Sequence, residues 1–410
     1  MRTESCAAAF RLAAAAIFSL HLSPVFAERA EAPPPEARET EKPSLALPSY
    51  GPETERATLE AARRYADIAA SGGWPHIRRP LGPDSHGKPV AELRRRLAIE
   101  GYLPQDQARD EDPRWDDDLT DAVRRFQAHV GLEQTGEVSR ETLLQLNVSP
   151  AARARALAAT AGRLSRMRFR FPERYVAVNL PAAAVEAVED DETQARYDAI
   201  VGGKRHPSPQ ITARIDSVDI NPAWTVPASI IRKELAPRLK RNPNYLAHEH
   251  IRIFDGRGHA VDPRRLRRLS AARAAHFTFR QDPGPNNALG SLRLSMPNKD
   301  AVYMHDTPRK DLFDRDYRFL SHGCVRVEGV YDLAAWLLND GAHKWDEAGL
   351  RDEVEEGRTE KIRLDHPTTV AWVYMTGWAT DDGPAQFRRD IYSLDKGAKP
   401  PPHGRAVALR

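Results

Sequence analysis

Hydrophobic residues recur every three or four positions through much of the first third of the chain. This spacing predicts helices, because one helical turn takes about 3.6 residues. The pattern indicates one helix over about residues 53–70 and three more within residues 85–148. In the second segment Gly101 and Gly131 are expected to end the first two helices, and Ser139 can cap the third. The N-terminal part is therefore predicted to be helical.

The pattern changes after about residue 170. Short apolar runs rich in β-branched residues follow, which is typical of strands, and an amphipathic helix is expected over residues 330–338. A mostly helical segment rich in Arg and Pro interrupts this region at about residues 227–277. We interpret it as an insertion that lies over the sheet and as a candidate lid. The clearest predicted strands are residues 175–180, 199–201, 217–220, 291–296 and 369–374.

The start of the chain predicts export. An apolar stretch, residues 12–20, follows Arg2 and Arg11, and a small-residue motif ends at Ala27, which is typical of a signal peptide. A permanent membrane anchor is the alternative, but the run is shorter than the ~20 residues that a span needs. The expected segments are a signal peptide (1–27), a disordered linker (28–52), a helical scaffold (53–84), a three-helix module (85–148), a linker helix (149–170), a strand-rich domain (171–396) and a flexible tail (397–410).

Composition excludes some classes of protein. The 410 residues carry 61 Lys and Arg against 58 Asp and Glu, so the formal net charge is only +3. A chain of this length, with 41% apolar residues, favours two or three domains with buried cores. Clusters of arginine such as residues 94–96 are interpreted as charged helix faces, because no continuous basic stripe is present. Nucleic acid is therefore not an expected partner.

Cysteine usage narrows the chemistry. The two cysteines are Cys6, within the predicted signal peptide, and Cys324. An exported mature protein would then hold one thiol, which cannot form an internal disulfide. Cys324 is consequently an inert buried residue, an intermolecular link or a reactive nucleophile.

Several residues near Cys324 could activate it as a nucleophile. A free thiol is mostly protonated at neutral pH, so a nucleophilic cysteine needs a base. His305 could serve if the chain returns on itself through neighbouring strands, and His322 would share a face with Cys324 in an extended segment. The amides of Gly323 and Cys324 could form an oxyanion hole, and Arg326 could pair with a substrate carboxylate.

Two other interpretations of this cluster compete. His305, His322 and Cys324 could bind zinc, but they are three, and no fourth ligand lies near them in the sequence. Cys324 could also be a small buried hydrophobic residue with core histidines around it. We therefore expect neither a metal nor an organic cofactor. The sequence also contains no phosphate-binding loop, dinucleotide fingerprint or serine-hydrolase elbow.

Residues 85–148 resemble the peptidoglycan-binding type 1 module. The family usually has Asp-Gly where this chain has Thr135-Gly136, and an unrelated three-helix bundle is the alternative. An ordered set of motif residues is more specific than a helical pattern alone. The resemblance is carried by residues 122–127 (AVRRFQ), Gly131-Leu132, Thr135-Gly136, Val138 and Thr142.

The second half of the chain resembles the L,D-transpeptidase catalytic domain, known as YkuD. His305 and the run from Ser321 to Arg326 match the catalytic motif of that family. The whole arrangement, over nearly all of residues 55–396, resembles the large L,D-transpeptidases of the YcbB type. It implies a multidomain α+β protein in which a three-helix module precedes a strand-rich catalytic domain with a mainly helical capping insertion. Further motifs in family order are residues 201–204, 221–224, 226–227, 281–284, 286–290 and Asn298.

The resemblance implies a two-step acyl transfer on peptidoglycan in the periplasm. Cys324 would attack the third residue of a tetrapeptide stem, normally diaminopimelate, and release the terminal D-Ala. His305 would be the base, and His322 with the Gly323 and Cys324 amides would orient the site and stabilise the oxyanion. Transfer to the side-chain amine of another stem would give a 3-3 cross-link. The expected substrate-binding residues are Arg326, Tyr303, Ser321 and Trp224.

The motif identifies a nucleophile but leaves the acceptor open. Water as acceptor would make the protein an L,D-carboxypeptidase, and a protein amine would make it a transferase that attaches stem peptides to proteins. A non-catalytic peptidoglycan-binding protein is the third alternative. The expected partners are stem peptides, glycan strands and other cell-wall synthesis proteins. Membrane association is expected only if the signal peptide is not cleaved.

Overall fold

The computed structural model describes residues 47–109, 114–242, 244–266, 270–339, 344–381 and 383–399. The predicted signal peptide and nearly all of the predicted tail lie outside these residues. The predicted disordered linker reaches into them, and for its last residues the prediction is wrong. Tyr50 is buried, and the backbone N–H and hydroxyl of Ser49 each donate to Glu186 at 2.8 Å. A tyrosine that can bury its ring among other aromatic side chains orders even a Pro-rich segment.

The helical part begins with α1 (Thr54–Ala70), which packs against α5 (Pro150–Leu164). The expected stops and caps of the module between them are confirmed. Gly101 takes a left-handed conformation with φ 87° after the first helix of the module, and Ser139 accepts a hydrogen bond from the Thr142 amide. The module consists of α2 (Lys88–Glu100), η1 (Gln107–Arg109), α3 (Asp117–His129) and α4 (Arg140–Leu146) around a core that includes Val90, Leu93, Leu97, Leu119 and Phe126.

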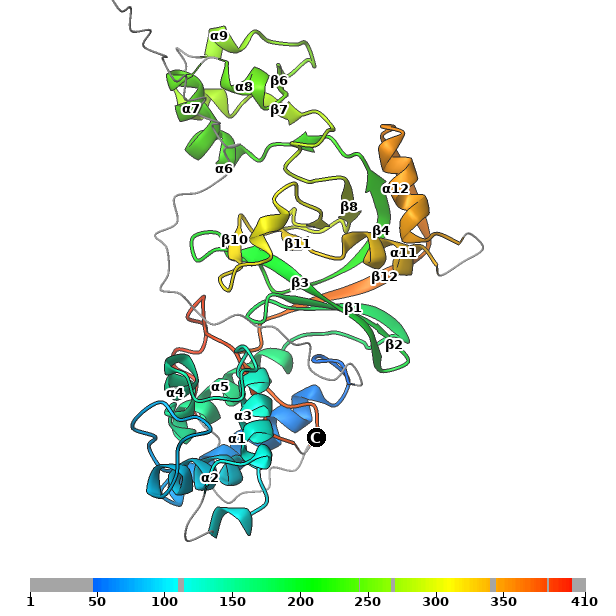
Figure 1. Cartoon of the computed structure of the whole chain (residues 1–410). Coiled ribbons are helices and arrows are strands. Elements are labelled where there is room, and N and C mark those ends of the chain that lie inside the picture. Colours follow the sequence, from blue (N-terminus) through cyan, green and yellow to red (C-terminus); the bar gives the residue numbers. More distant parts are fainter. Residues whose placement is uncertain are drawn as a thin grey trace, which may run out of the picture.

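The strand-rich domain is a closed sheet. Its strand order is β10-β3-β11-β9-β8-β4-β12-β1-β2, and β2 also pairs with β3, so the sheet returns on itself like a barrel. Apolar side chains from the strands fill its interior, and α11 (Val330–Leu338) and α12 (Glu347–Glu355) lie beside it (Figure 1). The strands are β1 (Arg174–Asn179), β2 (Ala184–Glu189), β3 (Glu192–Gly202), β4 (Ile211–Ile220), β8 (Leu292–Ser295), β9 (Met304–His305), β10 (Phe319–Ser321), β11 (Val325–Val327) and β12 (Glu360–Val373). The predicted α+β fold class is confirmed.

Residues 224–281, called the insertion below, leave the barrel between β4 and β8. The insertion was expected to lie over the sheet, whereas Figure 1 shows it standing off one end of the barrel, beyond β10 and β11. It has its own apolar core and a small antiparallel sheet, β5-β7-β6, that the helical pattern did not reveal. Its elements are β5 (Trp224–Thr225), α6 (Ala228–Ile230), the π-helix η2 (Ile231–Leu235), α7 (Ala236–Arg241), α8 (Tyr245–His248), β6 (Ile251–Phe254), α9 (Pro263–Leu266), α10 (Ala271–Ala274) and β7 (Thr278–Gln281).

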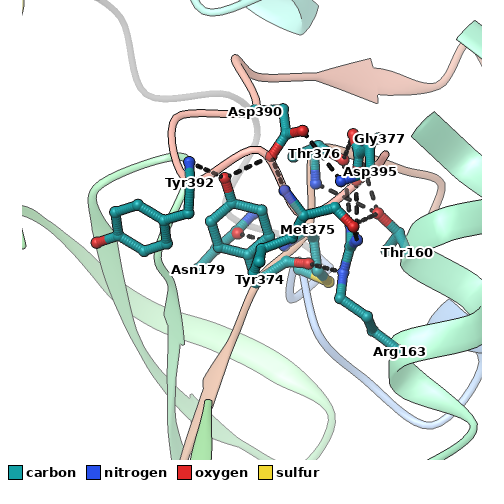
Figure 2. Close-up of polar contacts among 11 residues, drawn as sticks. Thr160, Arg163, Asn179, Tyr374, Met375, Thr376, Gly377, Asp390, Tyr392 and Asp395 are labelled. Carbon is teal, nitrogen blue, oxygen red and sulfur yellow. Dashed lines mark hydrogen bonds and ion pairs between the residues drawn. The ribbon is translucent and has the colours of Figure 1, made fainter. Parts of the chain in front are cut away.

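A buried polar joint fixes the helical part to the barrel. Arg163 of α5 donates to the Tyr374 carbonyl and to Asp395, both at 2.8 Å. Asp395 also accepts from the Thr376 hydroxyl at 2.7 Å, so residues from α5, the end of β12 and the C-terminal segment meet at one point (Figure 2). The short sheet formed by β13 (Gly377–Trp378) and β14 (Gln386–Phe387) lies against α1 and α5. Within the described ranges, no helix is long and apolar enough to cross a membrane.

Candidate active site

Two neighbouring strands bring the predicted catalytic residues together. β9 and β11 run parallel, with Met304 opposite Val325 and His305 opposite Arg326. His305 could come near Cys324 only if the chain folds back on itself, and this pairing of strands does so. Because side chains alternate along a strand, Met304 and Val325 enter the core while their neighbours take the other face. That face carries Tyr303, His305, Cys324 and Arg326.

The thiol of Cys324 is held by Tyr303. The sulfur accepts a hydrogen bond from the Tyr303 amide and another from the Tyr303 hydroxyl. Burial raises the pKa of Cys324 to about 11, although these hydrogen bonds and the nearby positive charge of Arg326 act in the opposite direction. The thiol is consequently protonated at neutral pH, and attack on a carbonyl needs a base that removes its proton.

His305 is the candidate for such a base. Its Nδ1 lies 2.5 Å from the carbonyl oxygen of Asp306, which places the hydrogen of the neutral ring on Nδ1, and the backbone of Leu289 is a second hydrogen-bond partner of the ring. The ring is only 5% exposed. Burial, together with the positive charge of Arg326, lowers the pKa of His305 to about 3. The imidazole is therefore neutral throughout the neutral pH range, and such a low pKa makes it a weak proton acceptor in this buried position.

Tyr303 connects the nucleophile to the insertion. The indole N–H of Trp224, on β5, donates to the Tyr303 hydroxyl, which in turn donates to the sulfur of Cys324. The Tyr303 ring also meets the His305 ring edge-on, with ring centroids 5.5 Å apart. Tyr303 and Trp224 were expected only as substrate-binding residues. Their protein contacts give them a part in placing the thiol as well.

The turn before Cys324 differs from the sequence expectation. Gly323 has φ +116°, which interrupts the extended backbone that would have put His322 and Cys324 on one face. The amide of Gly323 donates to the Ser321 hydroxyl at 3.1 Å, so it is already engaged rather than free for an oxyanion. Ser321 in turn donates to the Cys324 carbonyl at 2.5 Å. Ser321 and Gly323 therefore shape the turn that presents the thiol.

His322 points toward the insertion. Its Nε2 lies 2.8 Å from Oε1 of Glu234, and its ring stacks on His206 with centroids 4.4 Å apart. Sequence reasoning missed both partners. His206 follows the motif at residues 201–204, and Gly202 there allows the loop to fold back, because a Cβ on Gly202 would lie 2.3 Å from the His206 carbonyl oxygen. Glu234 had no signal in the sequence.

Arg326 places a positive charge beside the thiol. Burial lowers the pKa of its guanidinium, and the negative charge of a Cys324 thiolate would raise it. Its Nε atom is inaccessible to water and has no hydrogen-bond partner among the described residues. Among the residues that the structure describes, no group of three or more His, Cys, Asp and Glu side chains is placed so that it could hold a metal ion.

Comparisons with known families agree with the site. Residues 173–360 match the family model YkuD, described as "L,D-transpeptidase catalytic domain". Residues 86–146 match the model PG_binding_1, described as "Putative peptidoglycan binding domain". A curated protein of Haemophilus influenzae, named "Putative L,D-transpeptidase", is 34% identical over 221 residues. The match covers 53% of this chain and 44% of that protein, so the chain spans less than half the length of this relative.

Solved structures of similar proteins are more distant. An L,D-transpeptidase from Mycobacterium smegmatis has 13% identity and a TM-score of 0.25, with 49% of this chain and 58% of that chain covered. An L,D-transpeptidase from Xylanimonas cellulosilytica has 16% identity and a TM-score of 0.24, with 73% and 97% covered. The family assignment therefore rests on the sequence matches.

Proposed function

This chain carries the L,D-transpeptidase catalytic domain of the YkuD family together with a peptidoglycan-binding domain, and from that premise we propose that it forms 3-3 cross-links in peptidoglycan. Cys324 is the nucleophile, and the donor is a tetrapeptide stem whose third residue is diaminopimelate. The side-chain amine of a diaminopimelate in a second stem is the acceptor. The observation that supports this proposal is the parallel pairing of β9 with β11, in which His305 lies opposite Arg326, two residues after Cys324.

The first step acylates Cys324. His305 takes the thiol proton through Nε2 as the sulfur attacks the carbonyl carbon of the third stem residue. The tetrahedral intermediate collapses, the bond to D-Ala breaks, and the proton passes to the departing amine. A thioester remains on Cys324. The raised pKa of the thiol and the lowered pKa of His305 keep both groups neutral at rest and oppose the proton transfer, so this transfer has to be coupled to attack on the carbonyl carbon.

Substrate binding follows from the groups around the thiol. The guanidinium of Arg326 is suited to a carboxylate of the donor stem, because it places a positive charge beside Cys324. The peptidoglycan-binding domain raises the local concentration of stems by holding glycan strands near the catalytic domain. Export to the periplasm through the N-terminal segment is part of the same proposal, since the substrate lies outside the cytoplasm.

The proposal is tested by mass spectrometry of products from purified disaccharide-tetrapeptide. The mature protein should give dimers that lack one D-Ala, and Cys324→Ala should lower their yield at least ~10³-fold, as removal of a covalent nucleophile does. Equal melting temperatures would show that the variant is folded. Dimers formed equally well by Cys324→Ala would overturn the proposal. Tripeptide monomers alone would favour the L,D-carboxypeptidase alternative.

A further inference from the structure

A carboxylate of the insertion contacts the second histidine of the catalytic motif. Oε1 of Glu234 lies 2.8 Å from Nε2 of His322, and these side chains are 22% and 30% exposed. Glu234 belongs to the π-helix Ile231–Leu235. π-Helical turns are rare, appear mostly as single turns inside α-helices and are frequent at functional sites. Because the pair is partly buried, dissolved salt screens it less than it would screen an exposed ion pair.

The groups around this pair hold both partners. His206 stacks on the His322 ring at an interplanar angle of 30°, and Lys233 lies 3.2 Å from Nε2 of His206. Arg238 lies 3.9 Å from Glu234. Burial disfavours the Glu234 carboxylate, but the hydrogen bond with His322 and the charges of His322, Arg238 and His206 outweigh it and leave the pKa of Glu234 below its ordinary value. The carboxylate is therefore charged at neutral pH.

A carboxylate at Nε2 fixes the state of the ring. The hydrogen of a neutral His322 is held on Nε2, facing Glu234, so Nδ1 keeps its lone pair. The ring cannot rotate without losing both the hydrogen bond and the stacking on His206. His322 is two residues from Cys324, on the side of the turn that faces the insertion. The motif thus has a second histidine that is more exposed than His305 and paired with an acid.

We propose that Glu234 is a positioning residue for the second half of the reaction, in which the acyl group passes from Cys324 to the acceptor amine. This inference rests on the proposed function. As the acceptor nitrogen bonds to the thioester carbonyl carbon, Nδ1 of His322 takes a proton from that nitrogen. The carbon–sulfur bond breaks, and its electron pair returns to Cys324 as a thiolate. Glu234 holds the ring in place and stabilises the imidazolium that forms, so the insertion completes the catalytic motif.

The experiment separates the two half-reactions in the full mature protein. Acylation is measured as the single-turnover release of D-Ala from disaccharide-tetrapeptide, and transfer as the rate of dimer formation at saturating acceptor stem. Glu234→Ala should leave acylation within about twofold but slow transfer about 10- to 100-fold, since a hydrogen bond to a charged group is lost. Glu234→Gln keeps an oxygen acceptor for Nε2–H and should lie between Glu234→Ala and the unsubstituted protein, because it orients the ring without the charge.

Arg252→Ala is the matched control. Arg252 belongs to β6 of the insertion and pairs with Asp282 at the surface, with its own side chain 55% exposed, so both half-reactions should be unchanged. Transfer at the unsubstituted rate in Glu234→Ala would overturn the positioning role. Equal losses in both half-reactions, with a lower melting temperature, would also overturn it and indicate a purely structural contact. If the unsubstituted protein releases no D-Ala, the proposed function itself fails and the role of Glu234 falls with it.

Discussion

The helical part of the molecule and the insertion are joined to the same barrel by different kinds of contact. The helical part, residues 47–170, meets the barrel through buried polar groups that lie away from Cys324, such as the Arg163 joint (Figure 2). The insertion meets it at the catalytic motif, through Trp224 with Tyr303 and through Glu234 with His322. The first kind of contact fixes a geometry, whereas the second reaches the residues that we propose carry the chemistry.

Within the helical part, buried polar contacts also fix the module to the scaffold helix α1. Arg96 and Glu100 of α2 form a fully buried ion pair, and the Tyr65 hydroxyl of α1 donates to Glu100 at 2.8 Å. The Arg96 guanidinium also lies over the Trp74 ring, 3.7 Å from its centroid. Buried ion pairs tolerate little change in geometry, because each charge depends on its partner to offset lost hydration. The peptidoglycan-binding module is therefore docked on the scaffold rather than loosely tethered to it.

The largest effect is expected where that docking is broken. Arg96→Met leaves Glu100 buried without its partner and should lower the free energy of unfolding by about 3–5 kcal/mol. Chemical denaturation measures the loss, while cross-linking per folded molecule should stay unchanged. The double variant Arg96→Met/Glu100→Met should lose less, because no unpaired buried charge remains. An undiminished free energy of unfolding in the single variant would contradict the docking role.

A cavity in the insertion should instead lower the rate of cross-linking and leave the stability of the helical part unchanged. Leu239 is 1% exposed in the insertion core, and Leu239→Ala should remove about 3 kcal/mol of local stability. Amide hydrogen exchange should become faster across the insertion but stay unchanged in α1 to α5. Dimer formation should fall, because Glu234 and Trp224 would no longer be held in place. Faster exchange throughout the helical part would show that the two regions are not independent.

The smallest effect concerns acid sensitivity in the helical part. Burial lowers the pKa of His129 to about 4, with the charge of Arg388 acting in the same direction. The unfolded chain, with an ordinary histidine pKa of ~6.5, then binds the extra proton first, so stability is lost as pH falls from about 6.5 to 4. His129→Gln should remove about 2–3 kcal/mol of that loss between pH 7 and 4.5. Parallel stability curves for both proteins would contradict this assignment.

Local features were predicted well from the sequence. The ends of α2 and α4 follow from Gly101 and Ser139, whose effects on the backbone reach only a few residues. The strand at residues 175–180 and the helix at residues 330–338 follow from side-chain periodicity in the same way. The two predicted domain families also follow from ordered short motifs, and the sequence matches confirm them.

Features that join distant segments were not predicted. Tyr50 is ordered because its ring packs against Phe169 and Phe171, more than a hundred residues away, and its own neighbours in the sequence suggest disorder. The small sheet of the insertion depends on pairing of β5 and β6 with β7, although the segment between β5 and β7 is mostly helical. Pairing between remote segments leaves little trace in local periodicity, because either partner alone fits several structures.

The sequence by itself determined which residues could carry acyl transfer, because the types and order of a cysteine, its neighbouring histidines and an arginine identify the candidate groups. Only the tertiary structure decided how they are arranged. Parallel pairing of β9 and β11 puts His305 and Cys324 on one face, and Gly323 turns His322 away toward Glu234. The physical reason is that residue type sets what a group can do, whereas its pKa, partner and direction depend on segments that meet only in the folded chain.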